Sequence, residues 1–273
     1  MRVEFLKMHG AANDFVVVDH RKEHLPQGAE LEALVAQWCD RRRGVGADGV
    51  LLIERDPEHD FAMRYFNADG RAADFCGNGA RCVACLALEL GLGRTGEVRF
   101  RTAAGVMTAR RESAALVALR FGRVARASAE RVVEAAGRAF RGRLVVAGVP
   151  HFVTETQDLA GFDLREWGRA LRRHEAFAPA GANVDAVVRL GPGRVAMRTY
   201  ERGVEAETLA CGSGAMACAL WAAESGDRSP VTVRTAGGDD LLVRFEPLGS
   251  DWDVTLLGPA EVSFTGTWDT DAG

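Results

Sequence analysis

A short cysteine–glycine motif occurs twice in this chain, and it constrains the fold more than any other feature. The first copy is CGNGA at residues 76–80, and the second is CGSGA at residues 211–215. A run of small and apolar residues follows each copy and predicts a helix, and Gly91 or Gly226 follows that run, as glycine often does at helix ends. Each motif therefore places a cysteine at a helix N-terminus, where unpaired N–H groups and the helix dipole favour a thiolate or a substrate carboxylate.

Further matches at a similar spacing indicate an internal repeat. Four pairs of residues or dipeptides lie 134 to 137 positions apart, about half of the 273-residue chain: Phe15 with Phe152, Asp48 with Asp185, Met63-Arg64 with Met197-Arg198, and Cys76 with Cys211. Repetition at one spacing is typical of a duplicated structural unit. We expect two similar halves that each offer one cysteine to a cleft between domains, a common place for a binding site.

The apolar patterns predict strands and helices in the same order in both halves. In the first half we expect strands in 3–6, 15–18, 50–53, 63–66, 98–107 and 115–121, with helices in 26–40 and 81–90. In the second half we expect strands in 144–152, with a break at 148–151, and in 183–188, 195–200, 231–233, 241–245, 252–256 and 262–264, with helices in 164–174 and 216–223. The sequence GVGADG at 44–49 formally matches a dinucleotide-binding loop, but it precedes a strand instead of opening a helix.

Composition narrows the class of protein. The chain is 47% hydrophobic and 26% charged, enough apolar material for large cores, and its net charge of −4 argues against a nucleic-acid-binding face. It has no apolar run near the roughly 20 residues of a membrane span, and its first residues are too charged for a signal peptide. We therefore expect a cytoplasmic protein without a membrane or nucleic-acid partner. Its six cysteines are expected to be thiols, not a disulfide framework.

The two motif cysteines, Cys76 and Cys211, are candidates for proton transfer. Two thiols on opposite sides of one carbon can act as base and acid, so that configuration inverts. A free cysteine has a pKa near 8.5, and lowering it by ~1.5 units, which takes ~2 kcal/mol, makes about half of it thiolate at neutral pH. A helix N-terminus can supply about that much in a partly buried site. The remaining four cysteines lie in or beside apolar runs and are expected to be small core residues: Cys39, Cys82, Cys85 and Cys218.

On these motifs the chain resembles the diaminopimelate epimerase family. The matching stretches cover most of the sequence and are residues 8–10, 13–15, 44–49, 67–70, 76–82, 150–151, 183, 201–203 and 207–214. The resemblance implies a cofactor-independent epimerase that interconverts LL- and meso-diaminopimelate on the route to lysine and peptidoglycan. The two lysines, Lys7 and Lys22, lie in settings that do not suggest a Schiff base to pyridoxal phosphate, which agrees with that reading.

The resemblance also implies the fold and its division. It is an α/β (α+β) fold of two pseudo-symmetric domains, each a strand-rich sheet wrapped around a central helix. We place the N-terminal epimerase domain at 1–121, with the tail 262–273 returning to it, and the C-terminal epimerase domain at 122–261. A homodimer is possible in this family reading, and no metal is implied.

Roles for individual residues follow from the same resemblance. Cys76 and Cys211 are the base and acid pair. Four residues at the two helix N-termini offer hydrogen-bond donors to the reacting carboxylate: Gly77, Asn78, Gly212 and Ser213. Asn13 lies near the reacting end, and His151 and Glu201 lie close to its amino group. The far amino-acid end of the substrate is held by Asn67, Asn183 and Arg202, since the arginine fork can bind a carboxylate through two hydrogen bonds.

Three departures from the family pattern bear on which substrate the protein takes, and none of them involves the two cysteines. Val149 stands where many members have asparagine, Ala12 stands where many have glycine, and the segment 203–208 is one residue longer than the commonest form. A racemase of the same fold acting on another amino acid, such as histidine, is therefore an alternative. A thiol redox protein or a zinc-binding protein is a second alternative, motivated by the six cysteines.

Overall fold

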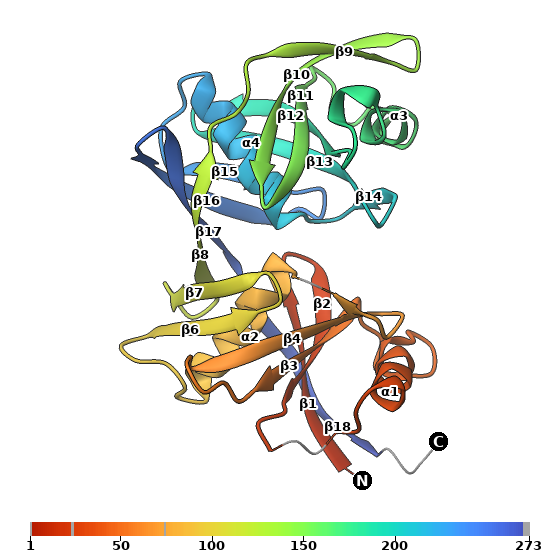
Figure 1. Ribbon diagram of the computed structural model, residues 1–273, viewed down its shortest axis with the longest axis vertical. Coiled ribbons are helices and arrows are strands. Elements are labelled where there is room, and N and C mark those ends of the chain that lie inside the picture. Colours follow the sequence, from red (N-terminus) through yellow and green to blue (C-terminus); the bar gives the residue numbers. More distant parts are fainter. Residues whose placement is uncertain (1, 23–24, 74, 270–273) are drawn as a thin grey trace. The chain divides into compact units, whose positions relative to one another are not determined.

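The computed structural model describes residues 2–22, 25–73 and 75–269 of the chain. It consists of two compact units, and Figure 1 colours them along the sequence. Unit 1 is Met1–Arg120 with Gly258–Gly273, and unit 2 is Phe121–Leu257. The return to unit 1 begins at Gly258, four residues before the predicted start at residue 262. Positions 270–273 of that tail lie outside the described residues.

Unit 1 is built from strands that surround one helix. Its elements are β1 (Arg2–Gly10), β2 (Asn13–Asp19), α1 (Ala29–Cys39), β3 (Gly49–Glu54), β4 (Phe61–Asn67), β5 (Ala72–Ala73), α2 (Gly77–Glu89), β6 (Glu97–Thr102), β7 (Gly105–Arg111), the start of β8 (Leu116–Ala125), and β18 (Glu261–Asp269). Helix α2 packs against β1, β2, β3, β4, β6 and β7, and its residues 78–87 are all buried. Burial on all sides agrees with the many glycine, alanine and cysteine residues of this helix, which are residue types often found fully buried.

Unit 2 has the same construction. Its elements are β9 (Arg131–Ala135), β10 (Arg138–Ala147), β11 (Val149–Glu155), a π-helical turn (Leu164–Gly168) leading into α3 (Arg169–Arg172), a 3₁₀ turn (Glu175–Phe177), β12 (Asn183–Gly191), β13 (Arg194–Glu201), β14 (Ala206–Thr208), α4 (Gly212–Glu224), β15 (Val231–Arg234), β16 (Asp240–Leu248), and β17 (Asp251–Pro259). Helix α4 packs against β10, β11, β12, β13, β15 and β16. Residues 131–143, for which the sequence analysis expected no strand, form β9 and most of β10.

The pairing of the strands confirms that the chain is an internal repeat of elements. In unit 1, β1–β2 is antiparallel, β2–β3 is parallel, β3–β4 is antiparallel, and β4–β6 is parallel. In unit 2, β10–β11, β11–β12, β12–β13 and β13–β15 repeat these directions in the same order. Helices α2 and α4 therefore occupy equivalent places in their own units.

Two of the four sequence matches are not structural equivalents. Phe15 faces α2, since a Cβ added at Gly79 would lie 3.5 Å from its ring. Phe152 instead belongs to the core cluster with Leu171 and Phe177, on the face of its sheet away from α4. An odd difference in register moves a side chain to the other face of a sheet, so the spacing of 137 residues cannot align these strands. Asp48 and Asp185 are not equivalent either, because Asp48 precedes β3 whereas Asp185 is the third residue of β12.

Two predicted elements of unit 2 differ in their bounds from the prediction. The expected break at residues 148–151 is shorter, because only Gly148, at φ 80°, leaves the β10–β11 ladder. Pro150 and His151 therefore lie within β11, which fixes the direction of the histidine side chain. The helix expected over 164–174 begins as a π-helical turn and ends at Arg172.

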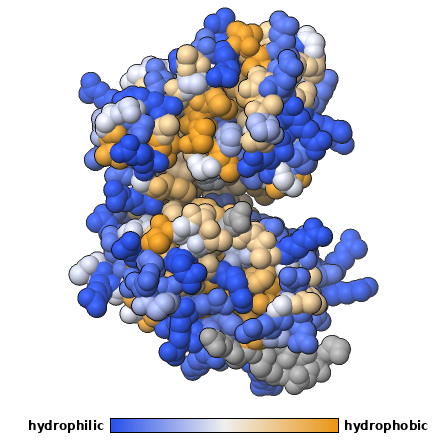
Figure 2. Space-filling view, viewed as in Figure 1, coloured by the Kyte–Doolittle hydropathy of each residue, from blue (hydrophilic) through white to orange (hydrophobic). Residues whose placement is uncertain are grey.

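The surface of each unit is largely polar. Figure 2 shows hydrophilic residues over much of the visible face of both units, with hydrophobic residues in small patches. The two central helices have 13 residues each, against about 20 for a membrane span, and no helix among the described residues is both long and apolar enough to cross a bilayer.

Candidate active site

The two motif cysteines hold the same backbone position in the two units. Cys76 is the N-cap of α2 with φ −139° and ψ 116°, and Cys211 is the N-cap of α4 with φ −128° and ψ 112°. Each thiol thus lies at the end of a helix whose first N–H groups have no partner within the helix. The second glycine of each motif is needed for packing, since a Cβ at Gly79 would lie 3.0 Å from Leu51 and one at Gly214 2.8 Å from Asp185.

In unit 1, a chain of amide side chains leads to Cys76. The thiol donates to Oδ1 of Asn13 at 3.4 Å, and Nδ2 of Asn78 donates to the same oxygen at 3.4 Å. Nδ2 of Asn13 donates to Asp48 at 2.6 Å, and Arg81 donates to Oδ1 of Asn78 at 2.9 Å. Arginine can only donate and a carboxylate can only accept, so the two ends of the chain fix the orientation of both amides.

A cluster of charges holds the far end of this chain. Arg41 donates to Asp48 at 2.7 Å and to both oxygens of Asp14, at 2.8 and 3.0 Å. The nearly buried Lys7 donates to Asp14 at 2.6 Å and also to the carbonyl of Gly46. Burial by itself raises the pKa of Asp14, but the hydrogen bonds and charges of Arg41 and Lys7 outweigh it and hold that pKa well below its usual range. Arg41 contacts both carboxylates and so connects Asp48, the acceptor for Asn13, to this cluster.

In unit 2, a different network leads to Cys211. Its thiol lies 3.4 Å from Oγ of Ser213, and the N–H of Gly214 donates to its sulfur at 3.4 Å. Ser213 Oγ lies 2.9 Å from Nε2 of His151, and Nδ1 of the same ring lies 2.7 Å from Asp185. His151 and Asp185 are both fully buried. The network thus joins the thiol of Cys211 to a buried histidine–aspartate pair.

The surroundings of Cys211 favour its neutral thiol. Burial is the main cause that raises its pKa well above the usual value, and the negative charges of Glu201 and Asp185 add to it. Hydrogen bonds from Ser213 and the N–H of Gly214 act in the opposite direction. Cys211 is 7% exposed, so the cost of charging it in a low-dielectric setting is the larger effect.

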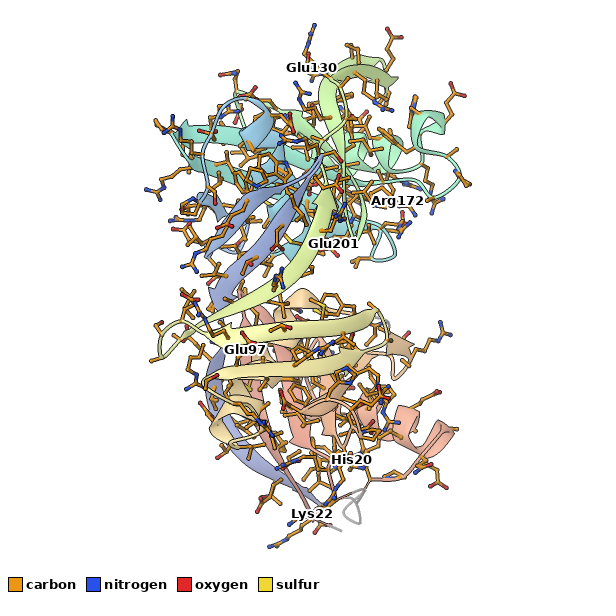
Figure 3. The ribbon with its side chains drawn as sticks, turned by 60° about the vertical axis from the view of Figure 1, so that its left-hand side comes forward. His20, Lys22, Glu97, Glu130, Arg172 and Glu201 are labelled. Atoms are coloured by element: carbon orange, nitrogen blue, oxygen red, sulfur yellow. The ribbon has the colours of Figure 1, made fainter. Side chains whose placement is uncertain are left out.

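The remaining predicted residues lie at strand ends or in turns. Glu201, labelled in Figure 3, ends β13 and accepts a hydrogen bond from Thr208 at 2.6 Å. The N–H of Arg202 donates to Oδ1 of Asn183 at 2.7 Å, and its guanidinium donates to the carbonyl of Ala180 at 3.2 Å. Asn67 ends β4, and within the part of the chain that the structure describes its side chain forms no hydrogen bond.

The structure therefore brings the predicted residues together in two groups, one within each unit. Cys76, Asn13 and Asn78 are connected in unit 1, next to Gly77. Cys211, Ser213, His151 and Asn183 are connected in unit 2, with Gly212 at the helix start and Arg202 attached through its backbone. Asn67 and Glu201 stay outside these hydrogen-bonded chains.

The other four cysteines are buried core residues, as expected. Their exposures are 5% or less, and burial raises the pKa of each: Cys39, Cys82, Cys85 and Cys218. For Cys39 the pKa rises to about 11. Among residues 2–22, 25–73 and 75–269, no three or more His, Cys, Asp or Glu side chains are placed to hold a metal ion.

Sequence reasoning missed four residues that support the site. Arg81 and Asp48 orient the amides beside Cys76, and Asp185 and Thr199 support His151, with the Thr199 hydroxyl donating to Asp185 at 2.7 Å. A signal for Asp185 was present, because it interrupts the apolar run NVDAVV in a predicted strand. A buried carboxylate needs a hydrogen-bonding partner, so an aspartate in such a run predicts a polar side chain close to it in the fold.

Comparison with known proteins assigns the chain to a family. A sequence model of diaminopimelate epimerase matches residues 5–126 and 143–256. The chain belongs to the diaminopimelate epimerase family. A diaminopimelate epimerase of Aquifex aeolicus (strain VF5) is 40% identical over 253 residues, covering 89% of this chain and 90% of that protein. Another, of Gemmatimonas aurantiaca, is 38% identical over 274 residues, covering 97% and 98%. The resemblance inferred from the motifs is thereby confirmed.

A solved structure supports the fold. A phenazine biosynthesis protein of the PhzF family from Enterococcus faecalis aligns with a TM-score of 0.73 over 98% of this chain and 100% of that chain, at 14% identity. At this identity the likeness concerns the fold alone. The expected α/β fold, with strand-rich sheets and few helices, is confirmed.

Proposed function

We propose that this protein interconverts LL- and meso-diaminopimelate without a cofactor, in the synthesis of lysine and peptidoglycan precursors. The observation that carries the proposal is the pair of cysteines, Cys76 and Cys211, at equivalent N-caps of two repeated helices in a chain of this family. The other four cysteines do not occupy helix N-caps, so the two motif thiols are set apart by their position at the starts of α2 and α4.

The chemistry needs both cysteines. One thiolate takes the α-hydrogen as a proton, and the thiol of the other delivers a proton to the opposite face of the same carbon, so the net charge of the pair is unchanged. The N–H groups of Gly77 and Asn78, and those of Gly212 and Ser213, are suited to hold the α-carboxylate while the carbon gains negative charge. Positioned acids and bases of this kind contribute typically 10²–10⁴-fold each.

Recognition of the second amino-acid end is assigned to Asn67, Asn183 and Arg202. The guanidinium of Arg202 is bound by one backbone carbonyl, which leaves nitrogen donors for a carboxylate. Asn183 already uses its amide within unit 2, donating to His151 at 3.2 Å, so its part is to hold Arg202 and His151 in place. Asn13, His151 and Glu201 are assigned to the reacting end.

A substrate panel tests this assignment. Purified protein is incubated with LL-diaminopimelate, with the meso form and with single amino acids that include histidine, and products are separated by chiral chromatography. We expect turnover of diaminopimelate and at most a trace with the single amino acids. Turnover of histidine without turnover of diaminopimelate would favour the racemase alternative, to which Val149 points. Stoichiometric zinc that binds through Cys76 and Cys211 would favour the metal-binding alternative.

We further propose that the enzyme works in the cytoplasm and forms a homodimer. A biosynthetic enzyme with two reactive thiols suits a reducing compartment. Fractionation of the source cells tests the location, and light scattering of the purified protein tests the dimer. A monomer at micromolar concentration would contradict the second statement.

A further inference from the structure

A cavity of about 610 Å³ lies in unit 2, between the helical turns around α3 and the β13–β14 hairpin. Figure 1 shows α3 and β14 on the same side of this unit. The charged and aromatic residues that line the cavity are Arg165, Arg169, Arg173, Tyr200, Glu205 and Glu207. Cavities of roughly 300–1,000 Å³ are of the size that small-molecule ligands occupy.

This cavity is separate from the network of Cys211. Tyr200 belongs to the core cluster that contains Leu171, whereas its neighbour Thr199 faces α4, since a Cβ added at Gly214 would lie 3.1 Å from its hydroxyl. Successive side chains of a strand point to opposite faces of the sheet. The cavity therefore lies on the face of the sheet away from α4, and no described residue of the Cys211 network lines it.

Two of the three cavity arginines are free to bind a ligand. Arg165 and Arg169 form no hydrogen bond or ion pair with any residue that the structure describes. Arg173 contacts Glu205 at 3.6 Å, and its side chain is 73% exposed. A separation of four residues places side chains on one face of a helix, so the three arginines form a row of about 12 Å, at about 1.5 Å per residue.

The two acidic residues of the cavity are already paired. Arg198 donates to both oxygens of Glu207, at 2.7 Å each. Arg172, labelled in Figure 3, contacts Glu205 at 3.1 Å. The cavity residues together with these two partners are five arginines and two glutamates, which leaves a formal charge of +3. The cavity therefore favours an anion with several negative charges.

We propose that this cavity binds a chain of phosphate groups, either free polyphosphate or the triphosphate of a nucleotide. Arginine presents a planar fork of donors that matches the oxygens of phosphate. A single phosphate group cannot reach every member of a row of about 12 Å, whereas a chain of phosphates extends along it. Binding of this kind makes and breaks no covalent bond.

Isothermal titration calorimetry of the full chain tests the site, with tripolyphosphate, ATP and inorganic phosphate as probes in a buffer without divalent metal ions. We expect one tripolyphosphate or ATP per chain, and phosphate to bind at least about tenfold more weakly. Joint replacement, Arg165→Gln with Arg169→Gln, is expected to weaken tripolyphosphate binding by about tenfold or more, because charge-assisted hydrogen bonds are lost. Arg131→Gln with Arg141→Gln removes the same charge from β9 and β10 and is the matched control, with an affinity expected within about twofold of the parent.

A further variant is expected to act in the opposite direction. Glu205→Gln removes a negative charge from the cavity and releases Arg173, so tripolyphosphate should bind about threefold more tightly. Equal affinity of ATP and tripolyphosphate would identify the phosphate chain alone as the ligand, and much tighter binding of ATP would identify a nucleotide.

Three results would overturn the proposal. They are no binding of tripolyphosphate, phosphate binding as tight as that of tripolyphosphate, and equal weakening in the two double variants, which would mean a general attraction to a basic surface. Circular dichroism checks that each variant is folded, and the replaced arginines are exposed on the surface. Calorimetry needs no turnover, so failure of the parent protein to act on diaminopimelate would overturn the proposed function and leave this test unchanged.

Discussion

The surroundings of Cys76 and Cys211 differ in side-chain chemistry although their backbones are alike. Cys76 is partly exposed and donates to the amide of Asn13, whereas Cys211 is 7% exposed and lies beside the hydroxyl of Ser213. Asn13 is hydrogen-bonded to a cluster of ion pairs that includes Asp48 and Arg41. Ser213 is hydrogen-bonded to the buried pair of His151 and Asp185. The repeat thus keeps a cysteine at the start of each central helix, and each half supplies different hydrogen-bonding partners for its own thiol.

The largest effect is expected from removing either thiol, because neither half can replace the other. Cys76→Ala and Cys211→Ala are each expected to lower kcat/KM for diaminopimelate by at least ~10³-fold, as a positioned acid or base is worth 10²–10⁴. Steady-state kinetics in both directions measures this. Cys39→Ala, which removes a core thiol, is the control and is expected to keep kcat within about twofold. A mild loss in only one of the two variants would mean that the halves are not partners.

A smaller effect is expected from loosening the amide chain of unit 1. Asp48→Leu removes the acceptor that orients Asn13, so the Asn13 amide is free to turn and its contact with Cys76 is lost. We expect kcat to fall by about tenfold, the equivalent of one good hydrogen bond to a charged group. Mapping of iodoacetamide adducts against pH should change at Cys76 and not at Cys211. Equal changes at both cysteines would contradict the separate control of the two thiols.

The charge cluster of unit 1 predicts a dependence of stability on pH. The pKa of Asp14 is lower in the folded protein than in the unfolded chain, so its contribution is complete above the unfolded pKa of about 4 and is lost progressively as pH falls from there toward the much lower folded pKa. Asp14→Asn is expected to cost about 1–2 kcal/mol of unfolding free energy at pH 7 and a smaller amount at pH 3. Urea unfolding of the parent and the variant at both pH values measures this, and an equal cost at both would contradict it.

The smallest effect concerns the turns that precede the two networks. In unit 1, Ala11 and Ala12 connect β1 to β2 at φ 56° and 63°, whereas Gly148 makes the equivalent turn of unit 2 at φ 80°. Side chains other than glycine are strained in this region. Ala12→Gly is expected to stabilise the protein by about 0.5 kcal/mol, and Gly148→Ala to destabilise it by about 1 kcal/mol. Thermal unfolding measures both, and a destabilising Ala12→Gly would contradict the strain.

Much of the fold could be predicted from local patterns in the sequence. The Cys-Gly-x-Gly-Ala motifs, the small-residue helices after them and the closing glycines at positions 91 and 226 follow from capping and packing rules that act within one turn of chain. The register of the repeat could not be predicted, since Phe15 and Phe152 match in sequence but lie on opposite faces of their sheets. Strand register depends on hairpin lengths, and those differ between the halves.

The candidate site, too, could be predicted only where its residues are close together in the sequence. Cys76, Cys211 and their neighbours along the chain were identified because each motif is contiguous. Asp185, Thr199, Arg81 and Asp48 were not, because their roles depend on partners far away in sequence, such as the 34 positions between His151 and Asp185. A polar residue within an apolar strand or helix is a local sign of such a partner, but the sign does not say which partner it is.

The most direct test of the two-thiol mechanism is hydrogen exchange at the α-carbon in heavy water. The parent protein is expected to incorporate deuterium at that carbon as it inverts configuration, and the product of a single turnover should carry solvent deuterium. Cys76→Ala and Cys211→Ala should each abolish inversion. Full exchange together with full inversion in either variant would contradict the account, because one remaining thiol would then be sufficient for both faces of the carbon.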